Sequence, residues 1–333
     1  MRKIKNIFFN ILRALGLGYL VWLLKTYIKL RFKIRALYVG VQENQKSSSN
    51  MYNFRRNIHR LEKGLSYKDL KEVFAEDYIG ETVEYLINGL DVFDKGSISW
   101  GKAVLNLYFK NVTPTKTIEK AFIKFSNLDQ NYDKSLVPYP SNLRVKSEVS
   151  YDDLMGLSLK RRSVRYYKDL KVEEEVIKKA YEIAKLAPSA CNRQSFNFYF
   201  YNEANEVKEL SSIPGGVQGY TLPSIIVVVG NYSGYFDERD INAPIIDSSL
   251  ATMSFIYALE TLGLSSVCIN WPNLPDREQK VRTKLDLASH EFVVMMIGVG
   301  YPIPDGKIPY SAKRSAEEVI HVNKKIRYRS NQN

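Results

Sequence analysis

The second half of the chain alternates between short apolar runs and longer segments with a helical repeat of apolar positions. Four runs contain β-branched or aromatic residues and several of them are apolar almost throughout, which favours strands. They are FNFYFY (196–201), SIIVVVGN (224–231), SSVCIN (265–270) and FVVMMIGVG (292–300). Because a strand that is apolar at every position has no face suited to water, we expect the sheet to be covered on both faces.

Three segments of this half predict helices. They are YDDLMGLSLKRR (151–162), KVEEEVIKKAYEIAKLA (171–187) and APIIDSSLATMSFIYALETLGL (243–264). The second has acids in its first turn and stops at Pro188. Its predicted shared face consists of Val176, Ala180, Ile183, Ala184 and Ala187. The third is so apolar that we expect it to be buried on nearly all sides. Helices and strands together predict a layered α/β or α+β fold.

The first half of the chain predicts helices without strands. Helical spacing of apolar positions occurs in 53–65, 69–90 and 100–128. Two polar or proline-containing segments, 41–50 and 135–145, are typical of linkers. The chain therefore divides into an N-terminal helix at 1–40, a helical region of unknown role at 51–145, and a domain at 151–329.

The positive charge of the chain is confined to its N-terminal part. The formal net charge is +12 at pH 7, yet residues 66–333 contain 34 basic and 34 acidic residues. Residues 1–65 contain 14 basic and 2 acidic ones and so carry the whole excess. This distribution argues against a nucleic-acid groove in the folded domain and predicts that the N-terminus meets a polyanionic surface.

The N-terminal segment is basic and apolar at once. Residues 1–35 contain nine basic residues and no acidic one, and their longest uncharged run is 14–24. A spanning helix needs about 20 mostly apolar residues, so this run is too short. It leads into KTYIKLRFKIR rather than a small-residue cleavage site, which argues against a signal peptide. Two interpretations remain: a helix in an anionic membrane interface, which we favour for residues 1–40, or a helix packed on the protein itself or on a partner.

Few cysteines and histidines are present. Two cysteines cannot build a disulfide framework, and three histidines show no metal-ligand spacing. A reducing compartment is expected. Together with the N-terminal helix, this predicts a cytoplasmic protein that is peripheral on the inner face of the cell membrane.

Candidate chemistry is concentrated in two segments of the second half. RRSVR (161–165) offers guanidinium forks that can each hold two phosphate oxygens. APSACNRQSF (187–196) offers amide side chains, whose donor and acceptor suit the edge of a heterocycle. Lys313 and Arg314 form a further basic pair. Each segment alone is also typical of a solvated surface, but we interpret the two as walls of a single pocket for an anion and a ring.

The order of these segments resembles the nitroreductase family of FMN-dependent flavoenzymes over residues 151–325. No glycine-rich phosphate fingerprint opens a strand–turn–helix unit, which argues against a Rossmann NAD domain. The resemblance implies an α+β fold: a mixed, mainly antiparallel sheet flanked by helices, here preceded by a helical N-terminal region.

The resemblance also implies which residues contact FMN. The arginine segment supplies Arg161, Arg162, Ser163 and Arg165 to the phosphate, the ribityl chain and the ring edge. The second segment lines the flavin with Pro188, Ser189, Asn192 and Gln194. The strand after the long helix brings Asn270 and Trp271 near N5, and the C-terminal pair Lys313 and Arg314 clamps the phosphate. No side chain is expected to act as a nucleophile, and no metal is implied.

Three departures limit the resemblance. The loop continues Gln194-Ser195-Phe196 where the family usually has Gln-Pro-Trp, and Asn270 stands where an acidic residue is common. The segment YSGYFDERDIN, between the strand at 224–231 and the following helix, is short and leaves little material for a large substrate lid. The family's substrates therefore do not transfer to this chain.

The function that the resemblance implies is hydride transfer from NADH or NADPH through FMN to a small-molecule acceptor, in an intertwined homodimer with FMN at the interface. Two alternatives stay open. One is a non-catalytic flavin-binding scaffold at the cytoplasmic membrane surface, and the other is a membrane-surface adaptor with a degenerate pocket.

Overall fold

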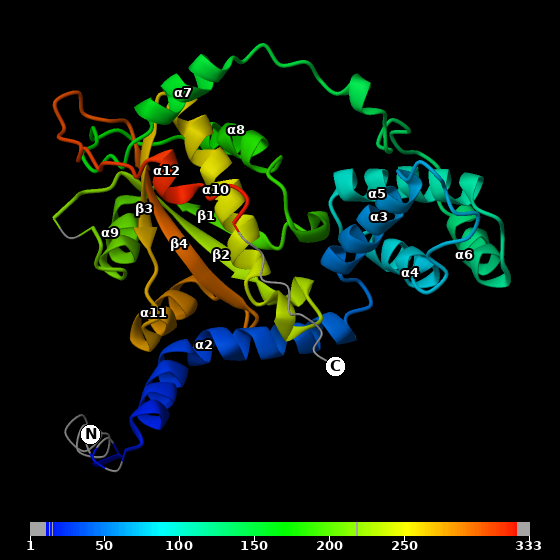
Figure 1. Ribbon diagram of the computed structural model, residues 1–333, viewed down its shortest axis with the longest axis horizontal. Helices are drawn as coiled ribbons and strands as arrows, with labels where there is room; N and C mark the ends of the chain where they lie inside the picture. The colour runs from blue at the N-terminus through cyan, green and yellow to red at the C-terminus, as the bar shows by residue number, and fades with distance from the viewer. Residues whose placement is uncertain (1–10, 13, 15, 218, 325–333) are drawn as a thin grey trace.

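The computed structural model describes residues 11–324 except 13, 15 and 218. Its C-terminal part is a sheet flanked by helices, its N-terminal part is a bundle of helices, and one long helix passes beneath the sheet (Figure 1). An extended connection that includes 135–145 arches from the bundle to the sheet domain, as the prolines of this segment predicted.

The sheet has four strands in the order β1-β2-β4-β3, and every neighbouring pair is antiparallel. The strands are β1 (Phe196–Tyr201), β2 (Ser224–Asn231), β3 (Ser265–Asn270) and β4 (Glu291–Gly300). A parallel bridge between Ser163 and Ser266 adds a short contact at the β3 edge, so the sheet is mixed and mainly antiparallel. The α+β prediction is confirmed.

Helices cover both faces of the sheet, as the apolar strands predicted. Side chains alternate between the faces of β2, which is buried along its whole length. Ile226 and Val228 pack under α8 and α10, whereas Ile225, Val227 and Val229 pack toward α9 and α11. The helices of this domain are α7 (Tyr151–Lys160), α8 (Glu174–Ala184), α9 (Ala204–Ser212), α10 (Ala243–Thr261), α11 (Pro275–Leu285) and the short α12 (Ala316–Val319).

Two predictions about this domain are wrong in detail. Helix α10 is not buried on all sides, because Ile246, Leu250 and Met253 are exposed along one stripe. In α8, Ile183 is exposed and does not belong to the buried face. Ile177 belongs to that face instead.

The N-terminal bundle has a core of its own. Its helices are α3 (Met51–Leu65), α4 (Ile79–Gly89), α5 (Lys95–Asn111) and α6 (Lys116–Ser126). Phe54, Ile58 and Leu61 form the buried face of α3 and pack against α4 and α5. The predicted helix at 69–90 is shorter and begins at Ile79, and the predicted helix at 100–128 is two helices separated by a turn.

Helix α2 (Gly18–Lys46) joins the two parts. Its C-terminal half packs on the sheet domain, where Leu37 and Val41 lie against Tyr232. Gly40 permits this approach, because a Cβ there would lie 2.5 Å from the Cβ of Tyr232. The segment 41–46, predicted to be a linker, continues the helix, and only 47–50 connects to α3.

The N-terminal half of α2 projects away from the body (Figure 1) and exposes Tyr19, Trp22 and Tyr27. In the described part of the chain, no helix has both the length and the apolar character needed to cross a bilayer. Residues 1–10 of the predicted N-terminal helix lie outside the described residues.

Candidate functional site

The segment 188–194 is held in an unfavourable backbone conformation. Cys191, Asn192 and Gln194 have φ values of 52°, 52° and 54°, in the left-handed region that residues other than glycine avoid. Each such residue costs about 1–3 kcal/mol and persists only where the surroundings enforce it. Backbone strain of this kind concentrates at functional sites, so this segment, here called the amide loop, is the first part of the candidate site.

Asp247 of α10 anchors the start of the amide loop. Both of its carboxylate oxygens accept the backbone N–H of Ala190, at 3.0 Å each. Tyr235 donates its hydroxyl to the same carboxylate at 3.3 Å. Burial raises the pKa of Asp247, and these hydrogen bonds partly oppose the increase. A buried carboxylate in an otherwise apolar helix thus fixes the start of the loop. The signal for this anchor in the sequence is that Asp247 is the one acid in the first half of the predicted helix.

Arg55 of α3 is a second anchor of the same loop. Its Nε donates to the backbone carbonyl of Asn192 at 2.9 Å, and its Nη1 donates to the hydroxyl of Ser97 at 2.7 Å. The guanidinium also lies 5.2 Å from the centre of the Trp100 ring. The N-terminal bundle therefore contacts the amide loop directly, which sequence periodicity alone did not show.

The two amide side chains of the loop bond to each other. Gln194 Nε2 donates to Asn192 Oδ1 at 3.0 Å. This bond leaves one amide oxygen, that of Gln194, and one amide nitrogen, that of Asn192, for a ligand. The pair thus presents an acceptor next to a donor, as the edge of a flat heterocycle requires. Ser189 accepts the backbone N–H of Gln194 at 3.3 Å and so belongs to the support of the loop.

The arginine segment 161–165 lies at the β3 edge of the sheet. The N–H of Val164 donates to the carbonyl of Ser266 at 3.1 Å, which fixes the segment beside β3. The guanidinium of Arg162 turns back onto the carbonyls of Ser158 and Arg161. That of Arg165 donates to the carbonyl of Ser163 at 3.1 Å.

A hollow of about 500 Å³ opens next to the arginine segment. Arg165, Asn270 and Arg277 are the lining residues with polar side chains of use to a ligand, and segments 214–217 and 267–270 supply much of the rest. Pockets for cofactors are commonly about 300–1,000 Å³. Two guanidiniums and an amide around such a hollow suit a ligand that combines an anionic group with a polar ring.

The amide loop and the arginine segment do not meet within one chain. The loop is tied to Asp247 near the start of α10, whereas Lys160, just before the arginine segment, donates to the carbonyl of Glu260 in the last turn of α10. At 1.5 Å per residue, these points are about 20 Å apart along the helix. The single pocket that both segments were predicted to line, in a homodimer with FMN at the interface, is therefore not formed by one chain alone and stays a prediction.

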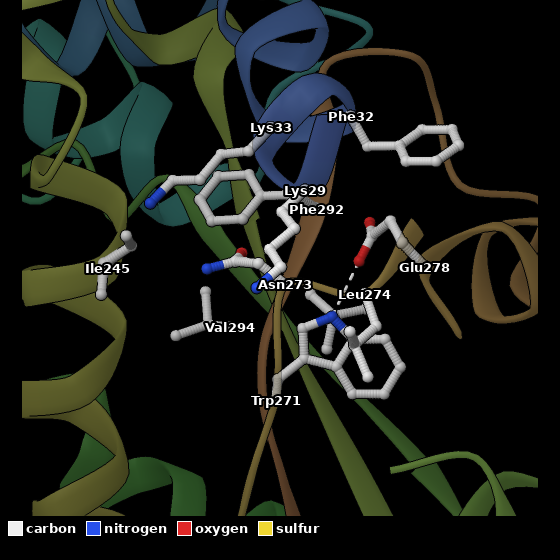
Figure 2. A pocket seen from close by; sticks show the side chains of 11 residues that line it. Lys29, Phe32, Lys33, Ile245, Trp271, Asn273, Leu274, Glu278, Phe292 and Val294 are labelled. Atoms are coloured by element: carbon white, nitrogen blue, oxygen red, sulfur yellow. Dashed lines mark hydrogen bonds between the residues drawn. The ribbon is translucent and has the colours of Figure 1, made fainter. Parts of the chain in front are cut away.

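Asn270 and Trp271 point to different sides of the sheet. Asn270 is exposed and lines the hollow, whereas Trp271 is buried and donates its indole N–H to Glu278 at 2.7 Å. Figure 2 shows Trp271 beneath α2, in a small cavity of about 140 Å³ that Lys29 and Lys33 also line. The Trp271 ring thus lies outside the hollow, and only its backbone remains a candidate for flavin contact.

In the described part of the chain, the C-terminal basic pair forms no hydrogen bond or ion pair with the other candidates. Lys313 and Arg314 are exposed, and Arg314 forms an ion pair with Glu318 at 3.5 Å. No described residue of the arginine segment or the amide loop bonds to either. That this pair clamps the phosphate stays a prediction.

Comparison with known proteins matches the part of the chain that forms the sheet domain. A sequence profile of the nitroreductase family matches residues 159–215 and 218–301, which include the arginine segment, the amide loop and all four strands. The helical bundle and α2 lie outside the match.

Two archaeal relatives each match about half of the chain, and both carry the provisional name NADH dehydrogenase/NAD(P)H nitroreductase. One, from Methanothermobacter thermautotrophicus, is 27% identical over 161 residues, 48% of this chain and 83% of the relative. The other, from Archaeoglobus fulgidus, is 26% identical over 176 residues, 52% of this chain and 99% of the relative.

A solved structure, that of a protein provisionally named NADH oxidase from Clostridium acetobutylicum, is 26% identical, with a TM-score of 0.44. It covers 51% of this chain and 99% of its own. The family match, the archaeal relatives and the antiparallel sheet between helices agree: the C-terminal half of this chain belongs to the nitroreductase family of oxidoreductases.

Proposed function

We propose that the protein is an FMN-dependent oxidoreductase that takes reducing equivalents from NADH or NADPH and passes them to a small-molecule acceptor. The observation that carries the proposal is the strained amide loop, which lies inside the family match and presents a donor and an acceptor from Asn192 and Gln194. FMN, when bound, supplies the hydride and electron chemistry, and the protein supplies binding, orientation and charge.

The chain's own residues have distinct parts in this proposal. The guanidiniums of Arg161 and Arg165 hold the phosphate and the pyrimidine end of the ring, where positive charge stabilises the reduced, anionic form. Ser163 adds a hydroxyl. The hollow beside Arg165 has the volume and the polar groups for such a ligand.

A homodimer completes the site in this proposal. Ile246, Leu250 and Met253 follow each other at i, i+4 and i+7 and form an exposed apolar stripe on α10; Leu250 is 43% exposed. The arginine segment and the amide loop flank opposite ends of this helix. If two copies pack their α10 helices antiparallel about a two-fold axis, the arginine segment of one copy comes beside the amide loop of the other. The separation within one chain thus favours a site shared by two chains.

The absorbance spectrum of the purified full-length protein tests the proposal. We expect a flavin band that bleaches when NADH or NADPH is added without oxygen. The double variant Arg161→Ala/Arg165→Ala should fold and lose the band, whereas Arg144→Ala, in the exposed connection, should keep it. A colourless wild-type protein after incubation with FMN contradicts the proposal. A band that neither nucleotide bleaches favours the flavin-binding scaffold instead.

We also propose that α2 places the enzyme on an anionic membrane surface. Trp22 is 58% exposed, and Tyr19 and Tyr27 are exposed on the same projecting half of the helix, among basic residues. Aromatic and basic side chains together suit the headgroup region of a bilayer. The double variant Tyr19→Ser/Trp22→Ser tests this without disturbing the half of α2 that packs on the body. The wild type should sediment with vesicles that contain phosphatidylglycerol and the variant should not; equal sedimentation of both contradicts the proposal.

A further inference from the structure

Two arginines from distant parts of the chain meet at one aromatic ring, where α3 packs on the amide loop. The guanidinium carbon of Arg56 lies 4.4 Å from the centre of the Phe236 ring, and that of Arg193 lies 5.6 Å from it. Burial lowers the pKa of Arg56, and the positive charges of Arg60 and Arg193 lower it further. Like charges thus gather at this junction.

Arg193 is buried without enough partners. It is only 4% exposed, and its Nη1 donates to the carbonyl of Ala190 at a long 3.3 Å. Its buried Nε has no hydrogen-bond partner among the described residues. A guanidinium has five N–H donors, and leaving a buried donor unpaired costs about 1–3 kcal/mol. The buried Nε therefore has no acceptor among the described residues.

Two carboxylates on the bundle side of the junction are engaged elsewhere. Asp77 pairs with Arg60 at 3.6 Å, on the outer side of α3. Glu81 accepts from Asn57 at 3.2 Å and also from the hydroxyl of Tyr85.

Asp247 is a buried acid on the domain side of the junction. Its charge acts on Arg193, but its oxygens accept from the loop backbone and from Tyr235. In the part of the chain that the structure describes, neither Arg56 nor Arg193 forms an ion pair with a carboxylate.

We propose that Arg56 and Arg193 form a binding site for an oxyanion, the carboxylate or phosphate group of the acceptor that the enzyme reduces. The identification of the ligand as the acceptor rests on the proposed function; the anion site itself does not. Planar guanidinium forks bind carboxylate and phosphate oxygens in pairs, and charge-assisted bonds of this kind are the strongest that side chains offer.

The position of the site explains what the N-terminal bundle adds to the family domain. Arg56 follows Arg55, which holds the carbonyl of Asn192, and Arg193 follows Asn192 in the amide loop itself. An anion held here lies next to the loop that lines the flavin in the proposed function. The bundle thus selects acidic acceptors over neutral ones by charge.

The anion site is tested first by binding. Thermal unfolding of the FMN-saturated protein is followed with increasing inorganic phosphate, and separately with benzoate, against sodium chloride of equal ionic strength. Saturation with FMN keeps phosphate out of the flavin site; if no FMN binds, the same titration is done on the protein as purified. A specific ligand raises the unfolding temperature with a saturable dependence on its concentration. We expect this for the wild type and for Arg144→Gln, and its loss in Arg56→Gln.

The variants separate an anion site from a packing role. Arg193 is buried, so Arg193→Gln could unfold, and Arg56→Gln and Arg56→Lys, on the more exposed partner, carry the test. The lysine variant keeps the charge without the fork and should retain part of the response. If phosphate and benzoate act no differently from chloride on the wild type, or act equally on Arg56→Gln, the site does not exist.

The identity of the ligand as the acceptor is tested by kinetics. The ratio of kcat/KM for 4-nitrobenzoate to that for neutral 4-nitrobenzamide measures the preference for an anion. Because a hydrogen-bonded charge contributes strongly, we expect a ratio of about ten or more in the wild type and a ratio near one in Arg56→Gln. A wild-type ratio near one, with anion binding intact, overturns the acceptor assignment alone. Failure of both acceptors to react counts against the proposed function and leaves the binding result to decide the anion site.

Discussion

The carboxylate of Asp247 accepts the backbone N–H of Ala190 with both oxygens at 3.0 Å, and so joins the start of α10 to the amide loop. The bond crosses 57 positions of sequence and reaches a loop in which three residues are held in the left-handed region. The helix that forms the exposed apolar stripe therefore also fixes the geometry of the candidate site.

The pH dependence of this anchor has a definite sign. Burial raises the folded-state pKa of Asp247 above its ordinary value of 3.8, so the folded protein binds the proton more tightly than the unfolded chain does. The resulting stability is fully present below pH 3.8 and is lost as the pH rises through the raised pKa. Asp247→Asn cannot take up this proton. We therefore expect the variant's deficit in unfolding free energy relative to the wild type to grow as the pH falls from 7 to 4, as measured by urea unfolding. A deficit that is constant or shrinks would show that Asp247 is ionised without penalty.

The strained loop predicts effects of different size for two substitutions of Cys191. Valine is β-branched and tolerates a positive φ poorly, whereas glycine adopts it freely. We expect Cys191→Val to lower the free energy of unfolding by about 2 kcal/mol more than Cys191→Gly does, since the left-handed conformation costs about 1–2 kcal/mol for ordinary side chains. Equal stability of the two variants in urea unfolding would mean that the loop is not held in this conformation.

The packing of α2 on the sheet domain depends on one glycine. An alanine Cβ at position 40 would lie 2.5 Å from the Tyr232 Cβ and 2.6 Å from its backbone carbon, so helix or loop must move. Overpacking of this kind costs about 1–3 kcal/mol. Gly80→Ala in α4 is the matched control, because no atom lies within 4 Å of its added methyl group and alanine favours a helix by about 0.5–1 kcal/mol. Thermal melts should show a lower unfolding temperature for Gly40→Ala and a higher or unchanged one for Gly80→Ala.

Local sequence patterns were sufficient for the strands and insufficient for the connections between distant segments. The bounds of β1, β2 and β3 agree with the predicted runs, because short segments with β-branched or aromatic residues favour strands. The segment 41–46 was wrongly predicted to be a linker because it is polar. Its Asn44 is buried and donates to the carbonyl of Ser233 at 2.7 Å, a partner 189 positions away.

For the candidate site, too, local patterns identified the segments but not their arrangement. Its two segments were recognisable from residue type, since guanidiniums suit a phosphate and amides suit the edge of a heterocycle. Their arrangement was not, because the length of α10 separates them and nothing in local composition reports that distance. The apolar character of Leu250 was equally evident in the sequence, but composition alone cannot tell whether the chain's own core or a second copy covers it.

The exposed stripe of α10 predicts the oligomeric state and links it to cofactor binding. Leu250 lies at the centre of the stripe, between Ile246 and Met253, so Leu250→Glu places a charge where two copies of α10 are proposed to pack. We expect the wild type to be a dimer in analytical ultracentrifugation and the variant to be a monomer with at least a tenfold weaker affinity for FMN, because each site needs the amide loop of the other chain. Val92→Glu, at an exposed position of the helical bundle, is the control and should stay a flavin-bound dimer. A monomeric wild type that binds FMN stoichiometrically would show that one chain builds the whole site, and the 20 Å between its two segments along α10 would then have to close by a movement within the chain.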